Sequence, residues 1–367
     1  MNEIESYFGN ETLNDIDSPQ FKAAVWIAGE DDALTLESIN PEIRTRLIQR
    51  YALAVLFYAT GGATHWISQS NFLSSDHECS WNMDVIPEPG TELFFALTDP
   101  DDPSDNFQNG VLKCKIMKDL GQVVTKVTMI DNNMTGQIPP EVFIGLPELE
   151  MLNLVKNKLH GTIPEEIYDS KLAAVWLALN SLTGTISPAV QNLGNTLHNL
   201  WIAYNDLSGT IPTEIGQLTL LENFGFSKNR LNGTIPKEVS EMQNLELFDV
   251  QGCSLSGWTP NAFTNISRLK VLDLGYNEIG GSIPDDIGYL CPSMQYLQLP
   301  YTGISGSIPF SIGSLSTLVL LSLQGNQLTG SIEPVADLST AWGITIQYNS
   351  LNGTIPRALG NTEGLGK

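Results

Sequence analysis

The chain contains 367 residues, of which 42% are hydrophobic, and its formal net charge at pH 7 is −23. This apolar content is enough for a packed core and excludes a wholly disordered chain. The strong negative charge argues against nucleic acid and anionic membrane surfaces as partners. The first residues lack the apolar segment of a secretory signal, and the longest apolar run, which begins at Tyr51, is too short to span a membrane.

The first third of the chain is predicted to contain an acidic, flexible segment over 1–17 and a helical cap over 18–121. Ser18 and Asn40 each precede a proline, which is the arrangement that begins a helix. The second of these helices is amphipathic and should end at Gly61 and Gly62. Such a cap would cover the open apolar end of the repeats that follow.

The cap contains an acidic insertion between Trp81 and Val111, which includes the sequence TDPDDPSDN. Its oxygen-bearing side chains suggest calcium, but the glycine and the closing glutamate of an EF-hand loop are missing. We therefore expect a solvated acidic loop, with neither a metal nor a cofactor. The side chains in question are Asp99, Asp101, Asp102, Asp105 and Asn106.

From residue 122 onward, leucine, asparagine, glycine and an Ile-Pro pair recur with a period of 23 to 25 residues. This period and pattern are the signature of leucine-rich repeats. The predicted fold over 122–367 is therefore an α/β right-handed leucine-rich repeat solenoid of about ten coils, with a parallel concave sheet and an uncapped C-terminal end. The copies are anchored at Met134, Leu159, Leu182, Leu207, Leu231, Leu255, Ile279, Ile304, Leu328 and Leu351.

Each repeat also predicts where its side chains point. Counted from the first leucine of the LxxLxLxxN pattern, positions one, four and six should face the core, as Leu221, Phe224 and Phe226 do in one coil. The asparagine at position nine should bond to the backbone of adjacent coils. Cys253 and Thr302 replace this asparagine and should form weaker bonds. Cys253 and the convex-side Cys291 are expected to be buried and free.

Positions three, five, seven and eight should face the concave side of the sheet. Trp176 and Trp201 occupy position five in adjacent coils, where core packing cannot explain them. Tryptophan and tyrosine are frequent at binding hot spots, so we predict a ligand-binding surface there, although these rings could instead fill space beneath an insertion or a neighbouring chain. The predicted contact residues are Met151, Trp176, Trp201, Tyr204, Asp249, Asp273, Tyr276, Tyr296 and Tyr301.

The sequence does not predict an enzyme. None of the four histidines has a nucleophile plausibly within reach. Asp249 and Asp273 would be spaced like the carboxylates of a retaining glycosidase, but they should lie on an open sheet without a walled pocket.

The LxGxIP form of the repeat, as in NRLNGTIP over 229–236, resembles the plant-type repeats of receptor-like kinases, receptor-like proteins and polygalacturonase-inhibiting proteins. The stretch RTRLIQRYALAVLFYATGGATHWISQSNFLSSDHECSW resembles the N-terminal cap of the receptor-like leucine-rich repeat family of diatoms. These resemblances imply an extracellular or cell-surface recognition domain that binds a protein, peptide or glycan on its concave face. They also imply a disulfide between Cys79 and Cys114, membrane attachment only through segments outside this chain, and a co-receptor or a second copy as a further partner.

Two other functions fit the same sequence. One is a secreted enzyme inhibitor or wall-associated protein of the polygalacturonase-inhibitor type. The other is ice binding by a file of hydroxyl side chains that Gln137 and Trp258 interrupt: Thr162, Thr185, Thr210, Thr234, Ser282, Ser307, Ser331 and Thr354. Five glycosylation sequons, which fit a secreted protein, lie at Asn10, Asn133, Asn232, Asn265 and Asn352.

Overall fold

The computed structural model describes residues 4, 11–29, 41–67, 69, 72–74, 78, 81, 111–117, 120–258, 262–263 and 266–361. The chain forms two compact units, Met1–Leu182 and Thr183–Lys367. The division between them falls inside the predicted repeat domain, so the domain boundaries predicted at 17 and 121 stay a prediction. Most of the segment 1–17 and of the acidic insertion lies outside the described residues.

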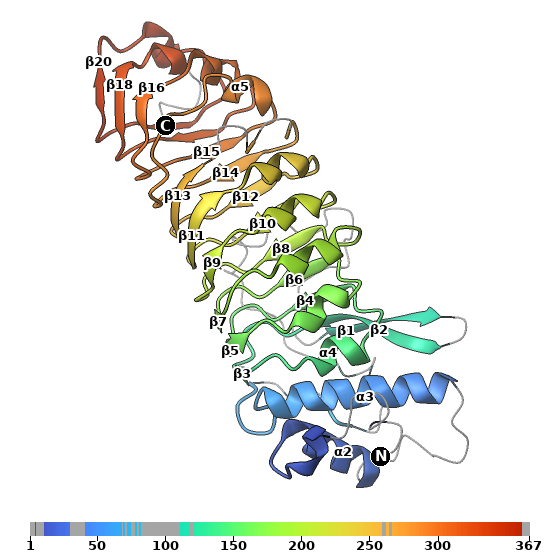
Figure 1. Ribbon diagram of the computed structural model, residues 1–367. Helices are drawn as coiled ribbons and strands as arrows, with labels where there is room; N and C mark the ends of the chain where they lie inside the picture. The colour runs from blue at the N-terminus through green and yellow to red at the C-terminus, as the bar shows by residue number, and fades with distance from the viewer. Residues whose placement is uncertain are drawn as a thin grey trace. The chain divides into compact units, whose positions relative to one another are not determined.

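Two cap helices precede the repeats in the first unit (Figure 1). Helix α2 spans Pro19–Gly29 and helix α3 spans Pro41–Ala59, so both helices begin at the predicted prolines. The hydroxyl of Ser18 accepts a hydrogen bond of 3.0 Å from the amide of Phe21 and caps α2. Among the described helices, none combines the length and the apolar character that crossing a lipid bilayer requires.

A β-hairpin joins the cap to the repeats, although a purely helical cap was predicted. Strand β1 (Val111–Met117) pairs antiparallel with β2 (Gly121–Thr128), and the sheet continues with parallel neighbours in the order β2-β4-β6. The other elements of the first unit are η1 (Glu11–Asn14), β3 (Thr135–Gly136), α4 (Glu141–Gly145), β4 (Met151–Asn153), β5 (Lys158–Thr162), η4 (Glu165–Asp169) and β6 (Ala174–Trp176), and β7 (Ser181–Thr183) reaches the boundary.

The second unit consists of repeats. Each coil supplies one short strand to a parallel sheet whose order, β8-β10-β12-β14-β15-β17-β19, follows the chain. These strands are β8 (Asn199–Trp201), β10 (Asn223–Gly225), β12 (Leu247–Asp249), β14 (Val271–Asp273), β15 (Tyr296–Gln298), β17 (Leu320–Ser322) and β19 (Gly343–Thr345).

The residues around the repeat glycine form separate three-stranded sheets, β9-β11-β13 and β16-β18-β20 in the second unit and β3-β5-β7 before it. Short helices complete most coils. The remaining elements are η5 (Pro188–Leu193), β9 (Ser208–Thr210), η6 (Thr213–Gln217), β11 (Arg230–Ile235), η7 (Lys237–Glu241), β13 (Ser254–Trp258), α5 (Ile287–Leu290), β16 (Ser305–Ser307), η8 (Phe310–Ser314), β18 (Gln327–Ser331), η9 (Glu333–Val335), β20 (Ser350–Asn352) and η10 (Arg357–Asn361).

The core of the repeats is built as predicted. Leu221, Phe224 and Phe226 are buried, and the ring of Phe224 stacks on those of Phe226 and Phe248 with centroids 4.5 and 5.0 Å apart. Each coil buries its apolar side against the next coil, because a single coil cannot exclude water from it. The predicted leucine-rich repeat solenoid is thereby confirmed.

The asparagines at position nine form the predicted ladder between coils. Asn229 accepts a hydrogen bond of 2.9 Å from the amide of Leu207 and donates two bonds of 2.9 Å, to the carbonyls of Ile202 and Phe226. Asn157, Asn180, Asn277, Asn326 and Asn349 repeat this arrangement. Three buried backbone groups per coil therefore depend on one amide side chain.

Thr302 and Cys253, which replace the asparagine of the ladder, form different hydrogen bonds. The hydroxyl of Thr302 donates to the carbonyl of Leu299 at 3.0 Å, whereas the thiol of Cys253 donates to the carbonyl of Phe226 at 3.4 Å. Cys253 and Cys291 are both free, but Cys253 is only half-buried, so the prediction of full burial was wrong there. Burial raises the pKa of both thiols, to about 12 for Cys291, so neither is a ready nucleophile.

Replacing Cys253 by asparagine should raise the free energy of unfolding by about 1 kcal/mol, because an amide at this position forms stronger bonds to the neighbouring coil than a thiol does. Guanidinium unfolding checks this. The matched control is Cys291→Asn, which places an amide in an apolar interior and should destabilise the protein. Equal effects of the two substitutions would contradict the ladder explanation.

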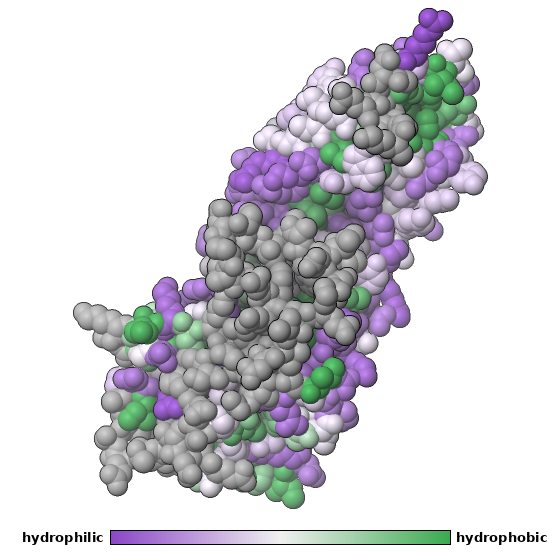
Figure 2. Space-filling model, turned by 180° about the vertical axis from the view of Figure 1, so that it is seen from behind, coloured by the Kyte–Doolittle hydropathy of each residue, from purple (hydrophilic) through white to green (hydrophobic). Residues whose placement is uncertain are grey.

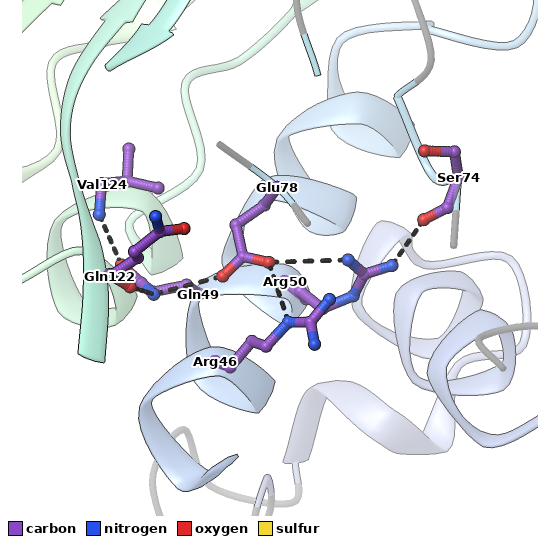
Figure 3. A network of polar contacts seen from close by, with 7 residues as sticks. All are labelled: Arg46, Gln49, Arg50, Ser74, Glu78, Gln122 and Val124. Carbon is purple, nitrogen blue, oxygen red and sulfur yellow. Dashed lines mark hydrogen bonds and ion pairs between the residues drawn. The ribbon is translucent and has the colours of Figure 1, made fainter. Parts of the chain in front are cut away.

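A buried polar network fastens the cap to the first strands (Figure 3). The side-chain carbonyl of Gln49, on α3, accepts a hydrogen bond of 2.7 Å from the amide of Val124, and its amide nitrogen donates to the carbonyl of Gln122 at 3.2 Å. The same nitrogen donates to Glu78 at 3.3 Å. Gln49 therefore satisfies backbone groups at the edge of β2 that the cap would otherwise bury unpaired.

Arg50 is the centre of this network and is completely buried. Its guanidinium lies against the rings of both Trp26 and Trp81, 5.1 and 4.8 Å from their centroids, and the two rings themselves meet edge to face. It donates to the carbonyl of Ser74 at 2.6 Å and pairs with the buried carboxylate of Glu78 at 3.5 Å. The predicted partner of Cys114, Cys79, lies outside the described residues, so that disulfide stays a prediction.

Candidate ligand-binding face

The side chains at position five form a row across the sheet of the second unit. Backbone pairing places Trp201 beside Gly225, Gly225 beside Asp249, and Asp249 beside Asp273. Successive side chains of a strand point to opposite faces, and Phe224 fills the core, so this row points away from the core as predicted. We call the surface formed by positions three, five, seven and eight the open face. It is the surface predicted to be concave.

The indole of Trp201 lies over the backbone of Gly225. A Cβ atom added to Gly225 would overlap the six-membered ring of Trp201. At position three of the same strand, the side-chain nitrogen of Asn223 donates a hydrogen bond of 2.6 Å to the side-chain oxygen of Asn199. The absence of a side chain at residue 225 therefore gives the indole a fixed seat on the open face.

Replacing Gly225 by alanine should displace the indole of Trp201 and lower the free energy of unfolding by about 1–2 kcal/mol, because the added methyl overpacks this position. Chemical unfolding and tryptophan fluorescence measure the two effects. In a Trp201→Ala background the same change should cost almost nothing, since the ring is already absent. An unchanged cost in that background would show that Gly225 serves another purpose.

Asp249 and Asp273 lie opposite each other on neighbouring strands. One oxygen of Asp249 accepts a hydrogen bond of 3.0 Å from the amide of Gln251, and one oxygen of Asp273 accepts a bond of 2.9 Å from the amide of Gly275. The side chain of Gln251 donates to the other oxygen of Asp273 at 3.2 Å. These bonds fix both carboxylates, and Asp273 is only 7% exposed.

The two carboxylates are held at an electrostatic cost. Burial raises the pKa of Asp249, and its backbone bond to Gln251 and its bond to the side chain of Ser227 offset only part of this. Burial and then the charge of Asp249 raise the pKa of Asp273 to about 7. Lys228 lowers both pKa values through its charge, but it does not cancel the rise.

Position eight, one residue before the ladder asparagine, has a left-handed backbone in coil after coil. Its φ is 54° at Tyr204, 55° at Lys228, 56° at Tyr276 and 52° at Tyr301. A non-glycine residue in this conformation costs about 1 kcal/mol, so the turn is imposed by the repeat and not by the side chain.

Three side chains of this row, those of Lys228, Tyr276 and Tyr301, are in contact. The rings of Tyr276 and Tyr301 lie 5.1 Å apart at an angle of 23°, and the Nζ of Lys228, which reaches across Gly252, lies 5.2 Å from the centroid of Tyr276. A Cβ atom added to Gly325 would overlap the ring of Tyr301, so that ring lies over the next coil. We call Lys228, Tyr276 and Tyr301 the tyrosine ridge. The two tyrosines are 49% and 45% exposed.

The other predicted contact residues are spread over both units. Tyr204 is exposed at position eight, and Tyr296 is half-buried at position three of β15. Met151 and Trp176 lie in the first unit, on β4 and β6, where Trp176 is beside Asn153. The second unit therefore holds the larger part of the predicted surface, from Trp201 to Tyr301, and the arguments below concern that unit alone.

Sequence reasoning missed three residues of this face. Gly225 seats the indole, Gln251 connects the two aspartates, and Lys228 covers one face of Tyr276. Gly225 stood in the predicted row at position five but was treated as a gap. Lys228 and Gln251 could have been found by following positions seven and eight through the repeats, as was done for position five.

The remaining predicted features lie elsewhere. The hydroxyl file is exposed from Thr162 to Thr354, and the side chain of Trp258 lies outside the described residues.

The asparagines of the predicted glycosylation sequons differ in their surroundings. The side-chain nitrogen of Asn133 donates to the carbonyl of His65 at 2.7 Å, whereas Asn232 and Asn352 are exposed. Asn10, Asn265 and the aspartates of the acidic insertion are not described. Within the described residues, no group of three His, Cys, Asp or Glu side chains is placed to hold a metal ion.

Exposed apolar side chains outside the open face are scattered. On the side of the molecule that Figure 2 shows, the hydrophobic areas of the described residues are separate and lie among hydrophilic ones. Ile355, Phe310 and Tyr289 are among the most exposed of these side chains, and they belong to different coils. Isolated exposed apolar residues are normal for a protein surface, whereas a stacked row is not.

Comparison with known proteins supports the fold. Residues 196–218 and 268–290 match the family described as Leucine Rich Repeat. The ectodomain of the plant membrane receptor kinase GASSHO1/SCHENGEN3 from Arabidopsis thaliana, solved with CASPARIAN STRIP INTEGRITY FACTOR 2, is 32% identical with a TM-score of 0.62, over 66% of this chain and 32% of that one. No curated protein matches this chain.

Two further solved structures are similar. The Arabidopsis receptor kinase HAESA, solved with the peptide hormone IDA and the co-receptor SERK1, is 28% identical with a TM-score of 0.62, over 67% of this chain and 41% of that one. A plant ice-binding protein is 21% identical with a TM-score of 0.60, over 83% of this chain and 95% of that one, which shows the fold alone. The chain spans less than half of either receptor ectodomain. The closer kinship with the diatom family stays a prediction.

Proposed function

We propose that this chain is a non-catalytic recognition domain of a receptor-like or secreted leucine-rich repeat protein, and that it binds a protein, peptide or glycan ligand on its open face. The observation that carries the proposal is the row of Trp201, Asp249 and Asp273 beside the tyrosine ridge. These side chains point away from the core, so packing does not explain them, and two of them are carboxyl groups whose ionisation burial opposes.

The comparisons support this proposal. The GASSHO1/SCHENGEN3 ectodomain was solved with an integrity factor, and HAESA with a peptide hormone and a co-receptor. By analogy, we propose an extracellular or cell-surface location, a peptide or protein ligand, and a co-receptor or second copy as a further partner. Membrane attachment would come from segments outside this chain.

Selection of ligands tests the proposal. The immobilised chain is offered a display library of random peptides and, separately, an array of glycans. Ligands that it selects should bind the Trp201→Ala variant at least about tenfold more weakly, because truncating an aromatic hot-spot residue costs about 2 kcal/mol or more of binding free energy. Trp176→Ala is measured separately because Trp176 lies in the first unit.

The matched control is Phe310→Ala, which removes an exposed aromatic ring on η8, outside the open face. It should leave the binding unchanged. A folded Trp201→Ala variant that binds the selected ligands as tightly as the wild type would remove the basis of the proposal.

A further inference from the structure

We infer that the open face of the second unit recognises a basic side chain of an extended peptide, with the lysine or arginine head group held between Asp249 and Asp273 and its aliphatic stem against the tyrosine ridge. The inference rests on the proposed function and narrows its ligand to one chemical class. Four observations carry it: the geometry of the two carboxylates, their incomplete counter-charge, the contacts that already occupy the tyrosine rings, and the spacing between Trp201 and the aspartates.

The geometry suits a single cation. Asp249 and Asp273 are direct partners in the register of β12 and β14, and neighbouring strands lie about 4.8 Å apart. Each carboxylate uses one oxygen to accept a backbone amide, which fixes its orientation. A carboxylate has about four acceptor positions, so capacity remains on both groups for a donor that approaches from the open side.

The incomplete neutralisation of Asp249 and Asp273 points to a cationic ligand. Lys228 is close enough to affect both aspartates, yet its Nζ lies over the ring of Tyr276, and no ion pair within 4.0 Å joins it to either carboxylate among the described residues. Residues 183–367 carry 14 acidic and 7 basic side chains, so the whole unit attracts cations. A ligand cation would add to the counter-charge that Lys228 supplies only in part.

The tyrosine ridge favours a peptide over a sugar. A sugar ring stacks on a free aromatic face, but the ring of Tyr276 already contacts both Lys228 and Tyr301, and the ring of Tyr301 also lies over Gly325. The ridge therefore leaves little free ring face for a sugar, whereas the apolar stem of a lysine or arginine can lie along it.

The spacing of the side chains at position five favours a peptide ligand in an extended conformation. Trp201 lies two strands from Asp249, which is about 10 Å. An extended peptide rises about 3.3 Å per residue, so a second anchor on Trp201 would lie three to four residues from the basic side chain.

The experiment uses four peptide libraries that are capped at both ends and differ only in a fixed central residue: lysine, arginine, norleucine or glutamate. Binding to the full chain is measured by fluorescence anisotropy. The lysine and arginine libraries should bind at least about tenfold more tightly than the norleucine library, and glutamate most weakly. The advantage should shrink between 50 and 300 mM salt, because part of it is screened.

The decisive variant is the double substitution Asp249→Asn and Asp273→Asn, which keeps the shape of both side chains. It should abolish the advantage of lysine and arginine and leave the binding of the norleucine library within about twofold. The matched control is Asp285→Asn with Asp286→Asn, which removes the same charge from an exposed turn before α5 and should preserve the advantage. Circular dichroism confirms that each variant is folded.

The outcomes separate the inference from the function on which it rests. If the wild type binds peptides without a preference for basic residues, or if the control loses the preference as fully as the decisive variant, the inference is wrong and the recognition function stands. If no library binds and a glycan is selected through Trp201 instead, the peptide ligand is excluded while recognition on the open face stands. If neither peptides nor glycans bind, both fail.

Discussion

Replacing Asp273 by asparagine should stabilise the protein by about 2–4 kcal/mol at pH 8 and have little effect at pH 4. Burial and the charge of Asp249 raise the pKa of Asp273 from an ordinary value of 3.8 to about 7 in the folded protein. The unfolded chain loses this proton near pH 4, whereas the folded chain keeps it until about pH 7. The stability of the wild type therefore falls as pH rises through this window, and asparagine, which has no proton to lose, removes the fall.

Guanidinium unfolding at pH 4, 6 and 8 measures this effect. Stacked repeats can open locally, so hydrogen exchange of the amides in β12 and β14 should accompany it. Asp285→Asn, on an exposed turn, should change stability by no more than about 0.5 kcal/mol at any pH. A gain from Asp273→Asn that is the same at pH 4 and pH 8 would mean that packing, and not charge, explains it.

Replacing Arg50 by methionine should lower the free energy of unfolding by about 3–5 kcal/mol, because it leaves the carboxylate of Glu78 buried with too little compensation. The contacts of the guanidinium with the rings of Trp26 and Trp81 and its bond to the carbonyl of Ser74 are lost at the same time. Thermal and guanidinium unfolding measure the loss. It should be largest in the first unit, as hydrogen exchange of α3 and β2 can show.

The double variant Arg50→Met with Glu78→Leu provides the control. Replacing both partners of a buried ion pair by apolar side chains is often tolerated, so this variant should recover most of the lost stability. Arg46 also pairs with Glu78, but its side chain is partly exposed. Arg46→Met should therefore lower the free energy of unfolding by less than Arg50→Met does. If the double variant is as unstable as Arg50→Met alone, the lost stability comes from the contacts of the guanidinium with the two tryptophan rings and not from the unpaired carboxylate.

The repeat itself made most of the fold predictable. The spacing of leucines and asparagines predicted the register of the strands in the large parallel sheet of the second unit, because each coil can bury its apolar side only in one arrangement. The smaller sheets around the repeat glycine were not predicted. Ser18 and the prolines at 19 and 41 correctly marked where the cap helices begin. The hairpin of β1 and β2 was not foreseen, since β1 follows the acidic insertion and carries no repeat pattern.

The site was predictable in its direction but not in its detail. Alternation along a strand was enough to place Trp201, Asp249 and Asp273 on the outer side. It could not show that Trp201 lies over Gly225 or that Lys228 stacks on Tyr276, because these contacts join different coils and depend on side-chain conformation. Likewise, Gln49 and Arg50 are two polar residues within an apolar helical run, a local anomaly whose buried partners come from distant segments.

The left-handed turn at position eight has an evolutionary consequence. Very different side chains occupy it, among them aspartate, lysine, leucine and tyrosine at residues 131, 156, 179 and 204. The backbone there is secured by the asparagine that follows, so the side chain is free to change without disturbing how the coils stack. Mutation can thus rewrite what each coil displays while its folding stays intact, and a chain of this kind can acquire a new specificity one coil at a time.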